Sequence, residues 1–290
     1  MWRMLPVIAL WVGGALPAPD AQPGPDARVT VQRPDVVWIP GGWFLRGSDE
    51  ADILYAVDLC REGGGHSFDC RPDGFVDEAP RERVWVSAFG IDRTEVTFAA
   101  WRRCVGANAC APTRINNGSE AARNRLAQPS HPVAGVTWDE ARRYCEWVSG
   151  RLPTEAEWER AARGHDGRRF PWGNYYNARL ANHGRPDGGV DGGDGFRWAA
   201  PVGSFPSAAS PYGILDAAGN VWEWTADVYE PEAYMDGTRV DPAREGGGGF
   251  RVIRGGSWAQ PPFRLRAADR EAVPEGEAMP DVGFRCAYDR

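Results

Sequence analysis

The second half of this 290-residue chain lacks the periodic patterns that specify long helices or strands. After Gly164, aromatic residues alternate with Gly, Asn, Asp and Pro, as in residues 170–174 and 210–214. The N–H and carbonyl groups of such irregular backbone still need hydrogen-bond partners once they are buried. Bound cations and disulfide bonds can hold such a backbone in place. We therefore expect a loop-rich α+β domain with little regular secondary structure, supported by both.

The six cysteines are an even number, which in an exported chain indicates disulfide bonds rather than redox-active thiols. Two pairs lie close enough in sequence to close locally, which leaves the last pair as a long-range bridge. The predicted bonds are Cys60–Cys70, Cys104–Cys110 and Cys145–Cys286. The alternative is free buried thiols. A zinc site is disfavoured because the chain has no Cys-x-x-Cys pair and no His pair at metal-ligand spacing.

The N-terminus has the pattern of a secretory signal. Arg3 precedes an apolar run over residues 5–16, and small residues and a Pro-rich segment follow. This run is too short and too close to prolines for a membrane span. We expect a signal peptide at about 1–21, a Pro-rich linker at 22–33 and one domain at 34–290, exported to the periplasm, the cell surface or the medium. A retained apolar anchor is the alternative.

Two helices in the middle of the chain have clear start signals. Thr137 and Thr154 each precede a glutamate by three residues, which is the spacing of a capping box. The predicted helices run from about 138 to 149 and from about 155 to 163, and each is followed by a glycine stop.

The secondary structure of the first part of the domain is predicted from the alternation of polar and apolar residues and from composition. Strands are expected at 35–39 and 84–91, and a helix at 97–105. Residues 48–80 are acidic and Gly-rich, and we interpret them as a surface insertion with one helical turn near 53–59.

Composition excludes several classes of function. The chain contains no lysine, so Schiff-base and lysine-base chemistry are excluded. The net charge of -7, with interspersed signs, argues against nucleic acid and anionic membranes as partners.

The glycine-rich stretch 181–196 is a candidate cation loop. Asp187, Asp191 and Asp194 present carboxylates on a backbone that can bend around an ion, and calcium takes six to eight oxygen ligands in flexible geometry. The alternative is a solvated acidic turn.

A second candidate lies at residues 215–224. Asp216 and Glu223 can clamp a cation together with carbonyls exposed at the Gly219 turn. The alternative is a capped turn beside two core tryptophans.

The window 254–270 concentrates arginines beside polar and aromatic residues. Guanidinium groups suit bidentate binding of carboxylates or phosphates, and a tryptophan can stack on a ligand. The candidate ligand-binding residues are Ser257, Trp258, Gln260, Arg264 and Arg270. The alternative is that Arg254, Arg264, Arg266 and Arg270 pair with the chain's own Asp and Glu. No Ser-His-Asp arrangement can be argued, because nothing places a His near Ser257.

Taken in order, a series of short motifs resembles the formylglycine-generating enzyme, or sulfatase-modifying factor, family. They lie at residues 39–42, 46–48, 95–97, 131–138, 144–147, 150–159, 171–174, 219–224, 254–258 and 283–286. The resemblance covers roughly residues 36–288. It implies a loop-rich mixed α/β fold related to C-type lectins and stabilised by calcium.

The resemblance also implies residues for two calcium sites. One would use the side chains of Asn182 and Asp194 with the carbonyls of His183 and Phe196. The other would use the side chains of Asp216 and Glu223 with the carbonyls of Gly219 and Val221. The family's bridge between its Tyr-Cys helix and its closing Gly-Phe-Arg-Cys supports the bond from Cys145 to Cys286.

The chain departs from the family at its reactive cysteines. The resemblance implies that active members oxidise a sulfatase cysteine to an aldehyde, using two cysteines after the Gly-Gly-Ser motif that bind copper(I) and the substrate thiol. Soft thiolate ligands suit copper(I). No cysteine lies between Ser257 and Cys286, where Gln260, Pro261 and Pro262 stand instead, so no copper is expected. Related sulfoxide synthases bind iron through histidines, and this chain has no His-x-x-x-His.

These observations predict an exported member of the family without thiol oxidation. We expect a binding or accessory module whose cleft accepts a peptide or a small acidic ligand. The alternatives are an enzyme, either a formylglycine-type oxidase or another protein-modifying enzyme in the same cleft, and a structural component of a cell-surface assembly.

Overall fold

The computed structural model describes residues 35–62, 70–114, 127–185 and 193–290. Its helices and strands are short and are joined by long irregular segments. The α-helices are α1 (Glu50–Glu62), α2 (Phe98–Gly106), α4 (Trp138–Trp147) and α5 (Glu155–Arg163), and the 3-10 helices are η1 (Pro72–Glu78), η3 (Pro206–Ala208) and η4 (Pro262–Leu265). The strands are β1 (Val36–Ile39), β2 (Gly42–Arg46), β3 (Glu82–Val86), β4 (Phe89–Asp92), β5 (Trp222–Val228), β6 (Phe250–Arg254), β7 (Arg270–Pro274), β8 (Val282–Gly283) and β9 (Ala287–Tyr288).

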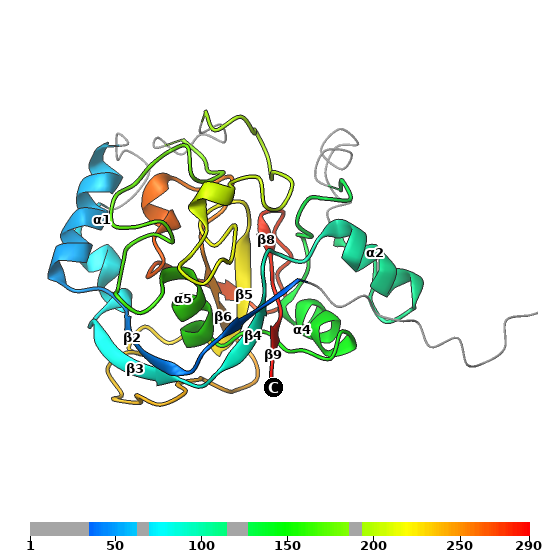
Figure 1. Cartoon of the computed structure of the whole chain (residues 1–290), viewed down its shortest axis with the longest axis horizontal. Coiled ribbons are helices and arrows are strands. Elements are labelled where there is room, and N and C mark those ends of the chain that lie inside the picture. The colour runs from blue at the N-terminus through cyan, green and yellow to red at the C-terminus, as the bar shows by residue number, and fades with distance from the viewer. Residues whose placement is uncertain (1–34, 63–69, 115–126, 186–192) are drawn as a thin grey trace, which may run out of the picture. The chain divides into compact units, whose positions relative to one another are not determined.

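The strands form three small sheets around one central helix. The sheets have the orders β1-β4-β9, β2-β3 and β7-β6-β5-β8, and the pairing of β5 with β8 is parallel while the others are antiparallel. Helix α5 contacts β2, β3, β5 and β6, while α1 and α2 lie at opposite margins of the domain (Figure 1). The buried side chains of α5, with Trp158 the largest, share one core cluster with residues of the β1-β4-β9 and β2-β3 sheets.

The helices with capping signals begin and end close to the predicted residues. In α4 and α5 the threonine oxygen accepts the N–H of the glutamate three residues on, and that glutamate accepts the N–H of the threonine. Helix α5 ends at Gly164, which has a φ of 76°. The side chains of Ala156, Trp158 and Ala161 on α5 are buried.

Other predictions of secondary structure were wrong. The stretch 84–91 forms parts of two strands, because β3 pairs with β2 while β4 pairs with β1 and β9. Helix α1 has 13 residues rather than one turn. Its first turn is stabilised by Asp49, whose carboxylate accepts the N–H of Asp52 at 3.0 Å. The second half contains a four-stranded sheet that we did not predict.

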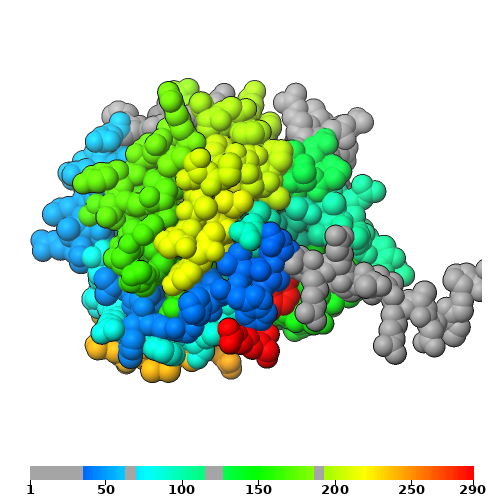
Figure 2. All heavy atoms as spheres, viewed as in Figure 1, coloured from blue at the N-terminus to red at the C-terminus, as the bar shows by residue number. Residues whose placement is uncertain are grey.

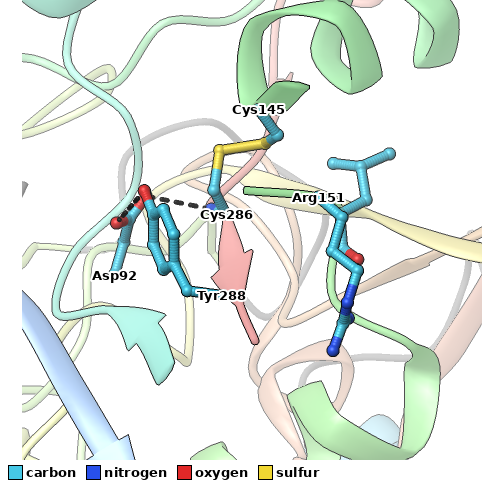
Figure 3. The surroundings of a disulfide bond; sticks show 6 residues. Asp92, Cys145, Arg151, Cys286 and Tyr288 are labelled. Carbon is cyan, nitrogen blue, oxygen red and sulfur yellow. Dashed lines mark hydrogen bonds between the residues drawn. A yellow bond between two sulfur atoms is a disulfide. The ribbon is translucent and has the colours of Figure 1, made fainter. Parts of the chain in front are cut away.

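All three predicted disulfide bonds are present. The long-range bond joins Cys145 of α4 to Cys286, just before β9 (Figure 3). Beside it, the N–H of Cys286 and the hydroxyl of Tyr288 donate to the Asp92 carboxylate at 3.0 and 2.9 Å. Burial raises the pKa of Asp92 to about 7. The C-terminal strand is thus fixed by one covalent bond and several polar contacts.

Some predictions lie outside the described residues. These are the signal peptide, the Pro-rich linker, Asp187 and Asp191. In the part of the chain that the structure describes, no helix combines the length and apolar character needed to cross a bilayer.

Candidate functional site

The arginines of the window 254–270 face the protein interior. Arg254 donates to Glu155 at 3.1 Å and to Glu159 at 2.7 Å, and Arg270 binds both oxygens of Glu155 at 2.8 and 2.9 Å. The guanidinium groups of Arg254 and Arg270 are completely buried. The alternative weighed from the sequence, pairing with the chain's own acids, therefore describes these arginines. Arg270 has no free face for a ligand in this arrangement.

Arg266 and Arg264 are also paired. Arg266 binds both oxygens of Glu78 at 2.6 Å, and both side chains are buried. Arg264 lies near Glu271 at 3.1 Å and remains partly exposed. Of the two predicted ligand-binding arginines, Arg264 is thus the one whose guanidinium is accessible to a ligand.

Ser257 and Trp258, two of the predicted ligand-binding residues, are buried. The Ser257 hydroxyl is buried and donates to Asp281 at 2.7 Å, and the carbonyl of Gln260 accepts the N–H of Gly184 at 2.8 Å. The ring of Trp258 packs edge-on against Trp198, with centroids 4.8 Å apart. Both indole N–H groups are buried and have no hydrogen-bond partner among the described residues. An unpaired buried donor costs about 1–3 kcal/mol, so an acceptor from a ligand or water would be favourable here.

The first predicted calcium site is assembled around Asn182. The carboxylate of Asp194 accepts the backbone N–H groups of His183 at 2.8 Å and of Phe196 at 2.9 Å, which brings the predicted ligands together. The side-chain nitrogen of Asn182 donates to the Trp198 carbonyl at 2.9 Å, while its oxygen Oδ1 is buried without a partner among the described residues. A buried amide oxygen without a partner fits an oxygen-preferring cation such as calcium.

The second predicted site adjoins the first. The N–H of Asn220 donates to the Asn182 carbonyl at 2.8 Å, and Asn182, Asp216 and Asn220 line one narrow pocket. Gly219 is required at this junction: its φ is 82°, and a Cβ atom there would lie 2.1 Å from the Asn182 carbonyl oxygen. The two predicted cation sites are therefore joined by direct backbone contact between residue 182 and residues 219–220.

The carboxylates of the second site outnumber their cationic partners. Glu223 accepts from Arg285 at 2.6 and 2.7 Å and from the Trp158 indole at 2.8 Å. Burial, followed by the nearby carboxylates of Asp216 and Glu223, raises the pKa of Glu95 well above its ordinary value. Three buried carboxylates thus surround one guanidinium.

Glu95 is the functional candidate that sequence reasoning missed. Both of its oxygens are buried and accept no N–H from the described residues, and its carboxyl group lies within hydrogen-bond reach of the Asp216 carboxylate. Its signal was the Glu95-Val-Thr motif, which we used only as part of the resemblance. Within the described ranges, no group of three or more acidic, His or Cys side chains has the geometry of a ready-made metal centre. A cation here would need carbonyl ligands, as the resemblance implies for Gly219 and Val221.

The fold and the site define a loop-rich α+β domain of the sulfatase-modifying type. A model of the "Sulfatase-modifying factor enzyme 1-like domain" matches residues 21–290. The chain belongs to this family, and the predicted loop-rich α+β fold is confirmed.

Relatives with different activities are similar to this chain to nearly the same degree. The "Formylglycine-generating enzyme" of Streptomyces coelicolor is 33% identical, over 96% of this chain and 96% of its own length. The "Inactive C-alpha-formylglycine-generating enzyme 2" of Mus musculus is 31% identical, over 97% and 92%. Among solved structures, PvdO from Pseudomonas aeruginosa has a TM-score of 0.68 at 24% identity, covering 89% of this chain and 95% of PvdO. Overall identity therefore does not separate active from inactive members.

Proposed function

We propose that this protein is an exported member of the family, stabilised by calcium and disulfide bonds, that does not oxidise thiols with copper and acts as a ligand-binding or accessory module. The observation that carries this proposal is the state of its cysteines. All six are in disulfide bonds, and none lies between Ser257 and Cys286. No thiolate remains to bind copper(I) or to exchange with a substrate thiol.

Calcium would have a structural role in this proposal. The oxygens of Asn182, His183, Asp194 and Phe196 would hold one ion, and those of Asp216, Gly219, Val221 and Glu223 the other, with Glu95 beside it. A divalent cation would offset the excess of buried carboxylate and satisfy the buried oxygens of Asn182 and Glu95. The ions would thereby fix the irregular segment that carries Trp198, whose ring packs against Trp258.

The ligand surface in this proposal is the exposed edge of the cleft. Arg264 supplies a partly exposed guanidinium and Gln260 a half-buried amide, whereas the ring of Trp258 is buried, with only 5% of its surface exposed. This set suits a peptide or a small acidic ligand. Ser257 and Arg270 would support the cleft from inside, because both are buried and paired.

A copper assay tests the absence of thiol oxidation. The protein is incubated with copper(I) and a synthetic peptide that carries the sulfatase cysteine motif, and aldehyde is measured by mass spectrometry after oxime labelling. The Streptomyces coelicolor enzyme, treated identically, is the positive control. We expect no aldehyde above the level of copper alone. Turnover of the peptide would overturn the proposal and favour the alternative function, an oxidase that uses other ligands. The 33% identity to the Streptomyces coelicolor enzyme supports this alternative.

A further inference from the structure

A large cavity in the described part of the chain lies outside the predicted cleft. It is a groove of about 560 Å³ between α1 and η1. It is lined by Ser48, Asp49, Glu50, Ile53, Leu54, Pro72, Asp73, Val76, Ala79, Pro80 and Arg81. Helix α1 reaches the molecular surface at the left margin in Figure 2. The volume falls within the range of about 300–1,000 Å³ that is common for ligand sites.

The two walls of the groove are held in fixed positions. The Cys60–Cys70 bond ties the C-terminal end of α1 to the segment that leads into η1. At the other end, the N–H of Ser48 donates to the Glu78 carbonyl at 2.8 Å and its hydroxyl to the Glu78 carboxylate at 2.9 Å. Because both ends are tied, the groove is formed before any ligand arrives, which lowers the entropic cost of binding.

The floor and rim of the groove are apolar. Leu54 on α1 and Val76 on η1 are 51% and 54% exposed, although both are large hydrophobic residues. Ile53, Pro72 and Pro80 continue the same surface. An apolar concave surface that is rigid and open to water is typical of a site that binds an apolar side chain of a partner.

The charges around the groove are mostly negative. Its lining contains the carboxylates of Asp49, Glu50 and Asp73 and a single guanidinium, that of Arg81. Arg81 is already paired with Asp49 at 2.6 Å and with Asp52. The N-terminus of α1 does not attract an anion either, because Asp49 accepts the N–H of Asp52. A cationic group is therefore the complementary partner at the rim.

We infer that this groove binds a peptide segment of a partner protein that presents an apolar side chain flanked by arginine or lysine. The apolar side chain would lie between Leu54 and Val76. The basic neighbours would lie against the exposed carboxylates of Glu50 and Asp73, the second of which lies 3.6 Å from Arg71. This interaction goes beyond the function proposed above, since it uses neither the cleft nor the calcium sites.

Fluorescence anisotropy with labelled dodecapeptides tests the inference. The probe has a central Arg-Leu-Arg in a Gly-Ser background, and the comparison peptides carry Glu-Leu-Glu or Arg-Ser-Arg at the same place. We expect the Arg-Leu-Arg peptide to bind most tightly, and its affinity to fall as salt increases because the rim contacts are exposed. Equal binding of the Glu-Leu-Glu peptide, or no binding of any peptide, would overturn the inference.

A pair of matched variants locates the binding site. Val76→Lys places a cation inside the groove, whereas Val240→Lys changes an equally apolar side chain that is 61% exposed elsewhere. We expect the affinity for the Arg-Leu-Arg peptide to fall at least about tenfold in Val76→Lys, because the variant loses an apolar contact and its lysine repels the arginines of the peptide. The affinity of Val240→Lys should stay unchanged. Thermal unfolding of both variants checks that they fold. Equal affinity of the two variants would refute the placement, and the copper assay is unaffected by either result.

Discussion

Removal of Arg266 tests whether the buried ion pairs hold the domain together. Its guanidinium binds both oxygens of Glu78 at 2.6 Å, and both side chains are only 2% exposed. In Arg266→Met the Glu78 carboxylate keeps only the Ser48 hydroxyl at 2.9 Å. Breaking a buried pair on one side costs about 3–5 kcal/mol. In a domain of this size that corresponds to a fall in Tm of roughly 6–20 °C.

The pH dependence of this loss has a definite sign. Burial acts to raise the pKa of Glu78, but Arg266 and Ser48 hold it below its ordinary value. The pair therefore stabilises the wild-type protein above the unfolded pKa of about 4.3, and this stability is lost as the pH falls through the folded pKa. Without Arg266, burial remains and the folded pKa rises. The deficit of the variant should thus be small near pH 4 and grow toward pH 7.

Urea unfolding followed by tryptophan fluorescence, with the disulfides intact, measures the effect. Arg142→Met is the matched control, because Arg142 forms exposed pairs with Asp139 and Glu146 and should change the free energy of unfolding by less than about 1 kcal/mol. The double variant Arg266→Met/Glu78→Gln removes the isolated charge and should recover part of the loss. The reasoning is refuted if Arg266→Met loses no more than Arg142→Met, or if the double variant recovers nothing.

Three further predictions concern the cation sites and the covalent bonds. A calcium chelator should lower the Tm by roughly 5–10 °C, since an ion present at 100 times its Kd adds about 2.7 kcal/mol; an unchanged Tm would count against both sites. In the presence of chelator, Glu95→Gln should stabilise the protein, and this gain should grow as the pH rises above about 4.3, because the raised pKa of Glu95 makes its ionisation unfavourable in the calcium-free fold. The same substitution should reduce the increase in Tm that calcium produces. An increase in Tm equal to that of the wild type would contradict a role for Glu95 at the cation site. Replacing Cys145 and Cys286 by alanine should cost about 5 kcal/mol and replacing Cys104 and Cys110 about 2 kcal/mol, from their separations of 141 and 6 residues; equal losses in urea unfolding would refute this order.

The features that could be predicted from the sequence are those encoded by neighbouring residues. A capping box is complete within four residues, so α4 and α5 were placed within two residues of their observed ends. Strand β5 has no such local signal. Residues Trp222 to Thr225 are all buried, and the strand pairs with β6 and β8 from distant parts of the chain, so alternation between its two faces is absent. Sheets assembled from short, fully buried strands therefore cannot be predicted from alternation of polar and apolar residues.

The candidate site was predictable in composition but not in pairing. The cluster of arginines was visible, yet Arg254 and Glu155 are 99 residues apart in sequence, and only the folded chain shows that they meet. The same holds for Glu95, because its proximity to Asp216 and Glu223 depends on two segments that are distant in sequence. Long-range electrostatic pairing decides whether an arginine faces a ligand or the core, and local sequence does not record it.

The connection between β2 and β3 links the new groove to the segment that lacks the family's cysteines. The hairpin ladder ends at the pair Arg46 and Glu82, so residues 47–81 are free to form α1 and η1 without disturbing its register. Glu78, at the end of this connection, is anchored by Arg266 from the window 254–270. The same window that carries no thiol thus holds one wall of the groove in place. Because a buried bidentate pair fixes the relative position of its partners, the Arg266–Glu78 pair couples the groove to the window 254–270.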